Sequence, residues 1–137
     1  MPGAHRTLHY GPDTYKVSTA VSGGQLVMAD ASNPGLVKPA TAAATTVLGV
    51  ALGEAGPVAA DADPLVVHQA QPEVAVAWNG DVDVTYTAGC ALGVLLVAGA
   101  NGAVTPAGAA PASDQIVGRC TATVSGAGLG RMRLAQP

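Results

Sequence analysis

A short phrase occurs twice in the chain and limits the possible folds more than any other feature. GLVKPA (35–40) is followed by a run of small residues and then by VLGV (47–50). GAVTPA (102–107) is followed by a similar run and then by IVGR (116–119). The recurrence predicts an approximate internal duplication.

The spacing of the two copies supports that prediction. Gly24 and Gly93 lie 69 residues apart, as do Val47 and Ile116, whereas the repeated phrase itself is offset by 67. The second copy therefore has a turn two residues shorter and a following loop two residues longer, and both changes fall where insertions are tolerated.

Each copy reads as a hairpin, a loop and a strand interrupted by glycine. Gly35 and Gly102 fall in the expected hairpin turns, and Gly49 and Gly118 interrupt the strands. A glycine inside a strand marks a bulge or a close backbone approach, which lets a sheet curl.

Short Val-, Leu- and Thr-rich runs separated by Gly, Pro, Asn and Asp clusters are typical of an all-β protein. The expected strands cover 25–29, 36–38, 47–52, 64–70, 73–78, 81–86, 93–98, 103–105, 116–124 and 130–135. With 137 residues, the chain is long enough for one domain. We therefore expect residues 21–137 to form a single small β-barrel or β-tulip-like sandwich with approximate internal duplication.

The alternating segment 73–86 predicts a hairpin between the two copies. A three-residue loop would pair Val76 with Val82 and leave Gly80 in the left-handed conformation of a bulged turn. Trp78 would then lie at the hairpin tip as an interface anchor. The alternative is that Trp78 folds back over the mouth of the barrel.

Residues 1–20 are polar and show no sustained periodicity, so we expect an extended N-terminal arm. Arg6, Tyr10 and Tyr15 would contact a partner when the arm becomes ordered, because tyrosine supplies rigid amphipathic contact area.

Two arginines near the C-terminus form a second candidate interface. Arg131 and Arg133 flank Met132, so Met132 and Leu134 would face inward while both arginines point outward. They either meet an acidic neighbour or form a solvated basic edge that discourages aggregation.

Composition favours association and disfavours several classes of partner. The chain has no Phe and one Trp, so its core consists of small residues, and an oligomer is expected to add stability. A net charge of −3 with scattered cations argues against direct nucleic-acid binding. No secretory leader or membrane-spanning apolar run is evident, so we expect a soluble protein made in the cytoplasm.

No catalytic motif, phosphate-binding loop or zinc spacing occurs. We expect no enzymatic activity, no cofactor and no metal site. Cys90 and Cys120 are interpreted as small buried thiols, with a disulfide or reactive pair as the alternative.

The arrangement of Gly, Val and Pro around short strands resembles the head-decoration (capsid-cement) proteins of tailed bacteriophages over most of residues 17–135. The resemblance rests on the first copy and on its weaker echo from Gly93 to Gly118, in which Arg119 stands where the first copy has Val50. The matching residues of the first copy are Gly24, Leu26, Val27, Gly35, Val37, Pro39, Val47, Gly49 and Val50.

This resemblance implies a compact barrel that binds the outside of a phage head. The partner would be the major capsid protein, and the protein would form a homotrimer at three-fold and quasi-three-fold positions. It would bind after the shell expands, resist the pressure of packaged DNA, and belong to the virion after synthesis in the host cytoplasm. The alternative is a small β-barrel binding module for glycan or protein on a phage head or fibre.

Overall fold

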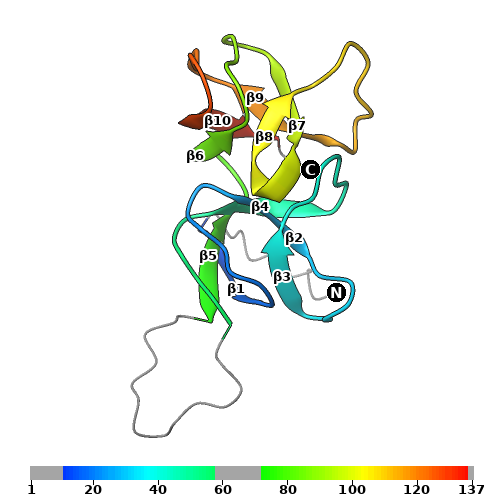
Figure 1. Ribbon diagram of the computed structural model, residues 1–137, viewed down its shortest axis with the longest axis vertical. Coiled ribbons are helices and arrows are strands. Elements are labelled where there is room, and N and C mark those ends of the chain that lie inside the picture. The colour runs from blue at the N-terminus through cyan, green and yellow to red at the C-terminus, as the bar shows by residue number, and fades with distance from the viewer. Residues whose placement is uncertain (1–10, 58–71, 136–137) are drawn as a thin grey trace, which may run out of the picture.

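The structure, a computed structural model, describes residues 11–57 and 72–135, in which ten strands and one short 3-10 helix occur (Figure 1). The first five strands are β1 (Asp13–Val17), β2 (Leu26–Ala29), β3 (Leu36–Pro39), β4 (Val47–Ala51) and β5 (Glu73–Ala77). The other five are β6 (Asp81–Tyr86), β7 (Leu95–Ala98), β8 (Val104–Pro106), β9 (Ile116–Cys120) and β10 (Gly128–Leu134), with η1 (Ala100–Gly102) before β8. The prediction of an all-β protein is confirmed.

The strands close into two five-stranded barrels, one above the other in Figure 1. Barrel 1 has the strand order β1-β3-β2-β4-β5, and barrel 2 has the order β10-β6-β8-β7-β9. In barrel 1, β1 runs parallel to β3 and antiparallel to β5. In barrel 2, β6 likewise runs parallel to β8 and antiparallel to β10. The predicted barrel architecture and internal duplication are confirmed, but the repeated unit is a complete barrel, so the chain builds two where one was expected.

The strand registers extend the duplication to single residues. Val17 pairs with Val37 in barrel 1, and Tyr86 pairs with Val104 in barrel 2, which reproduces the offsets of 69 and 67 seen in the sequence. Isolated bridges join Val21 to Ala55 and Cys90 to Val124, again 69 residues apart.

The two copies differ most in the connection between their last two strands. Residues 52–72 join β4 to β5, whereas residues 121–127 join β9 to β10. The offset therefore falls to 56 for the last strand, so that Val76 corresponds to Met132. The predicted strand 64–70 belongs to the longer connection and lies outside the described residues.

The two interrupting glycines occupy equivalent places, next to register shifts in the β2–β4 and β7–β9 pairs. A Cβ atom on Gly49 would collide with the carbonyl oxygen of Ala77, and one on Gly118 with that of Arg133. The predicted bulge and close approach are confirmed at both positions, and they let β4 and β9 curl against the last strand of each barrel.

Gly80 adopts the predicted left-handed conformation, and so do Gly35 and Gly102 in the predicted hairpin turns. The φ angles are +86° at Gly35, +82° at Gly80 and +74° at Gly102. Such angles are accessible to glycine without steric cost.

The predicted hairpin over residues 73–86 is wrong. β5 pairs with β1 and β4, and β6 pairs with β8 and β10, so residues 78–80 link the two barrels instead of forming a hairpin turn. Each strand alternates buried valines with more exposed residues. The same alternation of buried and exposed residues is therefore compatible with two strands that line different barrels and with a single hairpin.

An arm reaching to residue 20 is also contradicted. Asp13–Val17 forms β1, which closes barrel 1 between β3 and β5. Tyr15 lies half-buried against the apolar interior of that barrel, so it is a core-side residue and not part of an arm. Arg6 and Tyr10 lie outside the described residues.

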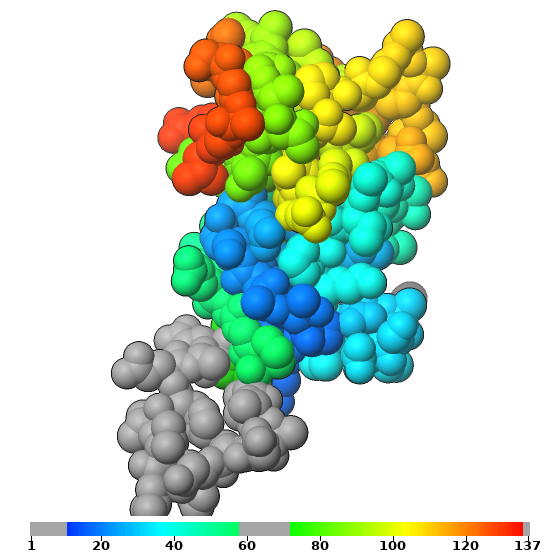
Figure 2. All heavy atoms as spheres, in the orientation of Figure 1, coloured from blue at the N-terminus to red at the C-terminus, as the bar shows by residue number. Residues whose placement is uncertain are grey.

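Two apolar clusters hold the molecule together. The first fills barrel 1 and is made largely of valines. The second fills barrel 2 around Tyr86, Leu96 and Met132, and it also includes Leu26 and Val50 from the outer surface of barrel 1. The two barrels are therefore packed against one another through a shared apolar cluster, and Figure 2 shows them in direct contact.

Candidate functional site

The junction between the barrels is the first candidate site. Hydrogen bonds cross it from the backbone amide of Thr85 to the carbonyl oxygen of Gly24 at 2.8 Å and from the amide of Gly102 to Ala40 at 2.8 Å. In the other direction, the amide of Ala43 donates to the carbonyl oxygen of Ala98 at 2.9 Å. Backbone groups that point out of each barrel are thereby satisfied by the other barrel.

A groove of about 430 Å³ lies along one side of this junction. Leu48 and Trp78 line it from barrel 1, and Ile116 and Leu134 line it from barrel 2. Its walls are mainly apolar, and Asp114 is the one charged residue among the described residues that line it. Such a groove suits an apolar or aromatic group of a partner.

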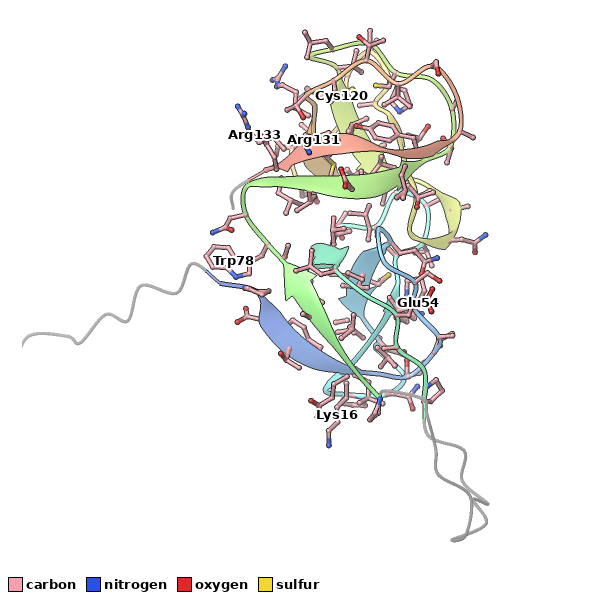
Figure 3. All side chains as sticks on the ribbon, turned by 90° about the vertical axis from the view of Figure 1, so that its left-hand side faces the viewer. Lys16, Glu54, Trp78, Cys120, Arg131 and Arg133 are labelled. Atoms are coloured by element: carbon pink, nitrogen blue, oxygen red, sulfur yellow. The ribbon has the colours of Figure 1, made fainter. Side chains whose placement is uncertain are left out.

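Trp78 does not lie at a hairpin tip. Its indole N–H donates to the carbonyl oxygen of Gly11 at 2.9 Å, which ties the side chain to the segment just before β1 (Figure 3). The ring is partly exposed in the inter-barrel groove. The hairpin-tip position is therefore wrong, and the role of Trp78 as an interface anchor stays a prediction.

The two arginines of β10 point outward, and the residues between and after them point inward, as predicted. Met132 is fully buried and Leu134 is 7% exposed. Arg133 Nε lies 2.9 Å from Asp81 Oδ1, and Arg131 Nε lies 3.9 Å from Asp83 Oδ1, both across the β10–β6 pair. The acidic neighbours therefore belong to the same chain.

These ion pairs are exposed, so they contribute little to stability. The hydrogen bond from Arg133 lowers the pKa of Asp81 and raises the pKa of Arg133 itself. The arginine side chains are 60% and 67% exposed, which leaves both guanidinium groups accessible to a partner.

Asp30 is the one buried charged side chain among the described residues, with 7% exposure. Its carboxylate accepts hydrogen bonds from Ser18 Oγ at 2.6 Å, from Asn33 Nδ2 at 3.0 Å and from the amide of Ser32 at 3.0 Å. These donors lower the pKa of Asp30 to about 2, with the bond from Ser18 as the largest cause. The carboxylate thus fixes the β2–β3 turn and has a structural role.

The cysteines are buried free thiols in barrel 2, as predicted. Burial, together with the neighbouring Cys120, raises the pKa of the Cys90 thiol to about 11. Burial also raises the pKa of Tyr86, whose hydroxyl donates to the carbonyl oxygen of Arg131 at 2.7 Å. A thiol with a raised pKa is a poor nucleophile at neutral pH.

Within residues 11–57 and 72–135, no cluster of three His, Cys, Asp or Glu side chains is placed to hold a metal ion. No helix in the same two ranges is long and apolar enough to span a membrane.

Sequence reasoning did not identify Arg119 as a site residue. Its guanidinium is exposed and donates to the carbonyl oxygen of Gly93 at 2.7 Å. Arg119 occupies the position in barrel 2 that Val50, fully buried at the junction, occupies in barrel 1. The sequence does show that the first copy has Val50 where the second copy has Arg119. It does not show that the other barrel covers this position in the first copy and leaves it exposed in the second.

Comparison with protein-family models and with curated proteins gives no match. Among solved structures, the crystal structure of the N base of head fibre gp8.5 in bacteriophage phi29 is similar, with a TM-score of 0.64. The match covers 90% of this chain and 92% of that chain at 13% sequence identity. The chain therefore shares the fold of the base of that head fibre protein.

Proposed function

We propose that this chain is a structural protein of a bacteriophage head. The observation that carries the proposal is the likeness of fold to a head fibre base, which extends over nearly the whole of both chains. The resemblance of the repeated phrase to capsid-cement proteins points in the same direction on independent grounds.

The finer proposal is a decoration (cement) protein on the outer surface of the capsid. It binds the major capsid protein as a homotrimer at three-fold and quasi-three-fold positions and stabilises the expanded shell against the pressure of packaged DNA. Three attachment points per trimer raise the avidity, because the second and third contacts become intramolecular.

The architecture suits a mechanical role. Both sheets close on themselves, so the described strands leave no open sheet edge to pair with other chains. A particle can then carry many copies side by side without edge-to-edge aggregation. Contact with the shell would come from side chains and loops on the outside of the barrels.

We propose no enzymatic activity, no cofactor, no direct nucleic-acid contact and no membrane association. The cations on barrel 2 are spread over an outer face on which Asp81 and Asp83 lie across from Arg133 and Arg131. A phosphate-binding surface would instead need an uncompensated basic patch.

The test is addition of the purified chain to empty shells of its own phage. Expanded shells should take up the protein, and unexpanded precursor shells should take up much less, because the binding surface is assembled by expansion. Co-sedimentation with the shells measures the difference. Equal binding to both forms, or binding to neither, contradicts the cement role.

A second candidate is a binding module, for glycan or protein adhesion, on a phage head or fibre. The inter-barrel groove with its partly exposed Trp78 favours it, since sugar rings and apolar side chains both stack on indole. Trp78→Ala should abolish adhesion to host cells while leaving co-sedimentation with shells unchanged. Loss of shell binding instead would place Trp78 in the capsid contact.

A further inference from the structure

The contact between the two barrels joins two different surfaces. We call the surface of barrel 1 its wall and the surface of barrel 2 its rim. The wall of barrel 1 comprises Gly24, Leu26, Ala40, Val50 and Ala77. The rim of barrel 2 comprises Val82, Thr85, Ala98, Gly102 and Leu129.

Because the barrels are duplicates, each also carries the surface that the other uses. The equivalent wall of barrel 2 comprises Gly93, Leu95, Ala107, Arg119 and Arg133, of which the arginines are exposed and the others partly exposed. The equivalent rim of barrel 1 comprises Asp13, Lys16, Ala29, Gly35 and Glu73. We refer to these as the second wall and the second rim.

Two glycine pairs show that the second surfaces are open among the described residues. A Cβ atom on Gly24 would meet Leu129 at 2.8 Å, and one on Gly102 would meet the carbonyl oxygen of Leu26 at 2.8 Å, in each case on the other barrel. Their equivalents, Gly93 and Gly35, have no atom within 4 Å of such a Cβ.

The sequence differences on the second wall are changes from apolar to cationic. Arg119 replaces Val50, and Arg133 replaces Ala77. With Asp81 bonded to Arg133, the second wall keeps one net positive charge. An apolar partner of the kind found within the chain would bury the Arg119 guanidinium without a carboxylate partner, which is costly.

The differences on the second rim are complementary. Asp13 replaces Val82, and Glu73 replaces Leu129. Lys16 lies opposite Glu73 on the β1–β5 pair, so the second rim carries charged residues where the rim of barrel 2 carries Thr85 and Leu129. The apolar contact within the chain thus has a charged counterpart on its two unused surfaces.

The two unused surfaces belong to different barrels and face away from one another. In Figure 3, Arg133 on the upper barrel points away from the lower barrel, and Lys16 points away from the upper one. A single chain cannot bring them together. We propose that the second wall of one copy docks on the second rim of another copy, in a head-to-tail contact that repeats the contact between the two barrels.

The duplication specifies the central pair of this contact. Leu129 lies over Gly24 within the chain, so Glu73 of a neighbouring copy lies over Gly93. That glycine carbonyl already accepts a hydrogen bond from Arg119 at 2.7 Å, which places the Arg119 guanidinium beside the incoming carboxylate. The contact is heterologous, so it closes into a ring or continues as an open chain. This inference rests on the proposed homotrimer in one respect: the closed form is taken to be a ring of three copies.

The test is charge exchange at this pair in the full chain, read by native mass spectrometry and sedimentation over a range of concentrations. Arg119→Glu alone and Glu73→Arg alone should each weaken self-association by at least about tenfold, because like charges then face each other. The double variant Arg119→Glu/Glu73→Arg should restore it. The control is Arg131→Glu, which makes the same charge change at a residue of β10 that does not belong to the second wall. It should have little effect on self-association.

The unfolding temperature of each variant shows whether the barrels remain intact. Folded single variants that still associate like the parent chain overturn the contact, as does a parent chain that is monomeric at all concentrations. A monomeric parent chain that still binds expanded shells would overturn the contact while leaving the cement function standing. Self-association without shell binding would contradict the cement function and leave the head-to-tail contact standing.

Discussion

At the residue scale, two glycines determine how tightly each barrel closes. Gly49 and Gly118 occupy equivalent places in β4 and β9, and in both cases the backbone of the facing strand occupies the space that a side chain would need. Because the obstacle is backbone and not the end of a flexible side chain, the strand itself must move to admit a methyl group.

Gly49→Ala and Gly118→Ala should each lower the free energy of unfolding by about 1–3 kcal/mol or more, as overpacking does. Denaturant unfolding of the purified variants measures the loss. Gly108→Ala is the matched control, since no atom lies within 4 Å of a Cβ there, and its effect should stay within about 0.5 kcal/mol. Similar stability for all three variants would contradict the close approach.

Asp30 should make stability depend on acid pH. Its pKa is about 2 in the folded chain against an ordinary value of 3.8, so the folded state favours the charged carboxylate. The resulting stability is present above pH 3.8 and is lost as the pH falls toward 2. Thermal unfolding across this range should therefore show a smaller pH dependence for Asp30→Asn than for the parent chain.

Single residues were predicted well where local conformation decides them. Gly35 and Gly102 lie in the predicted β2–β3 and β7–β8 hairpin turns, and both adopt left-handed angles. Trp78 was harder to place, because its surroundings come from the start of β1 and from barrel 2, which are distant in the sequence.

At the element scale, the position of most strands followed from the sequence, but the pairing of strands did not. The alternation in β5 and β6 shows which face of each strand is buried, and it was correct. It does not show which strand lies beside it, because an inward-facing valine is satisfied by any apolar interior. The prediction paired β5 with β6, its nearest neighbour in sequence, whereas in the structure these two strands pair with β1, β4, β8 and β10.

β1 shows the same limit. Its alternation over Asp13–Val17 is short and includes polar residues, so the segment resembles an arm until its partners β3 and β5 are known. The pairing on both sides makes β1 indispensable to closure of barrel 1.

Truncation should separate the strand from the residues before it. Removing residues 1–17 deletes β1 and opens barrel 1 at two edges, so the product should aggregate or unfold at a markedly lower temperature. Removing residues 1–10 leaves every described strand in place and should preserve the unfolding temperature. If the proposed arm contacts of Arg6 and Tyr10 hold, the shorter truncation should also weaken shell binding. Equal stability of both products would contradict the role of β1.

The wall of barrel 1 provides a second prediction for an element. Val50 is fully buried at the junction, whereas its equivalent Arg119 is exposed. Val50→Arg should cost roughly 3–5 kcal/mol, because it places an unpaired charge in the shared apolar cluster. Arg119→Val should change the free energy of unfolding by less than about 1 kcal/mol. A tolerated arginine at position 50 would show that the barrels are not held together by this cluster.

At the scale of the whole molecule, duplication explains how a chain with so few large apolar side chains can fold. Each barrel interior is narrow, so Val, Ala and Cys fill much of it, and the larger side chains Leu26, Leu96 and Met132 belong to the cluster shared by both barrels. The sequence repeat predicted the duplication, but the size of the repeated unit depended on non-local closure of each sheet. The charged residues of the outer surface differ between the two copies, as at Val50 and Arg119, so the repeat alone does not identify the partner.

The central proposal is that this chain is a structural protein on the outside of a phage head. A density map of the intact particle tests it most directly. The map should show pairs of closed barrels, in three-fold groups, resting on the outer face of the expanded shell at three-fold and quasi-three-fold positions. A fully occupied particle whose outer surface carries no such pair of barrels, or whose barrels lie inside the shell, would contradict the account.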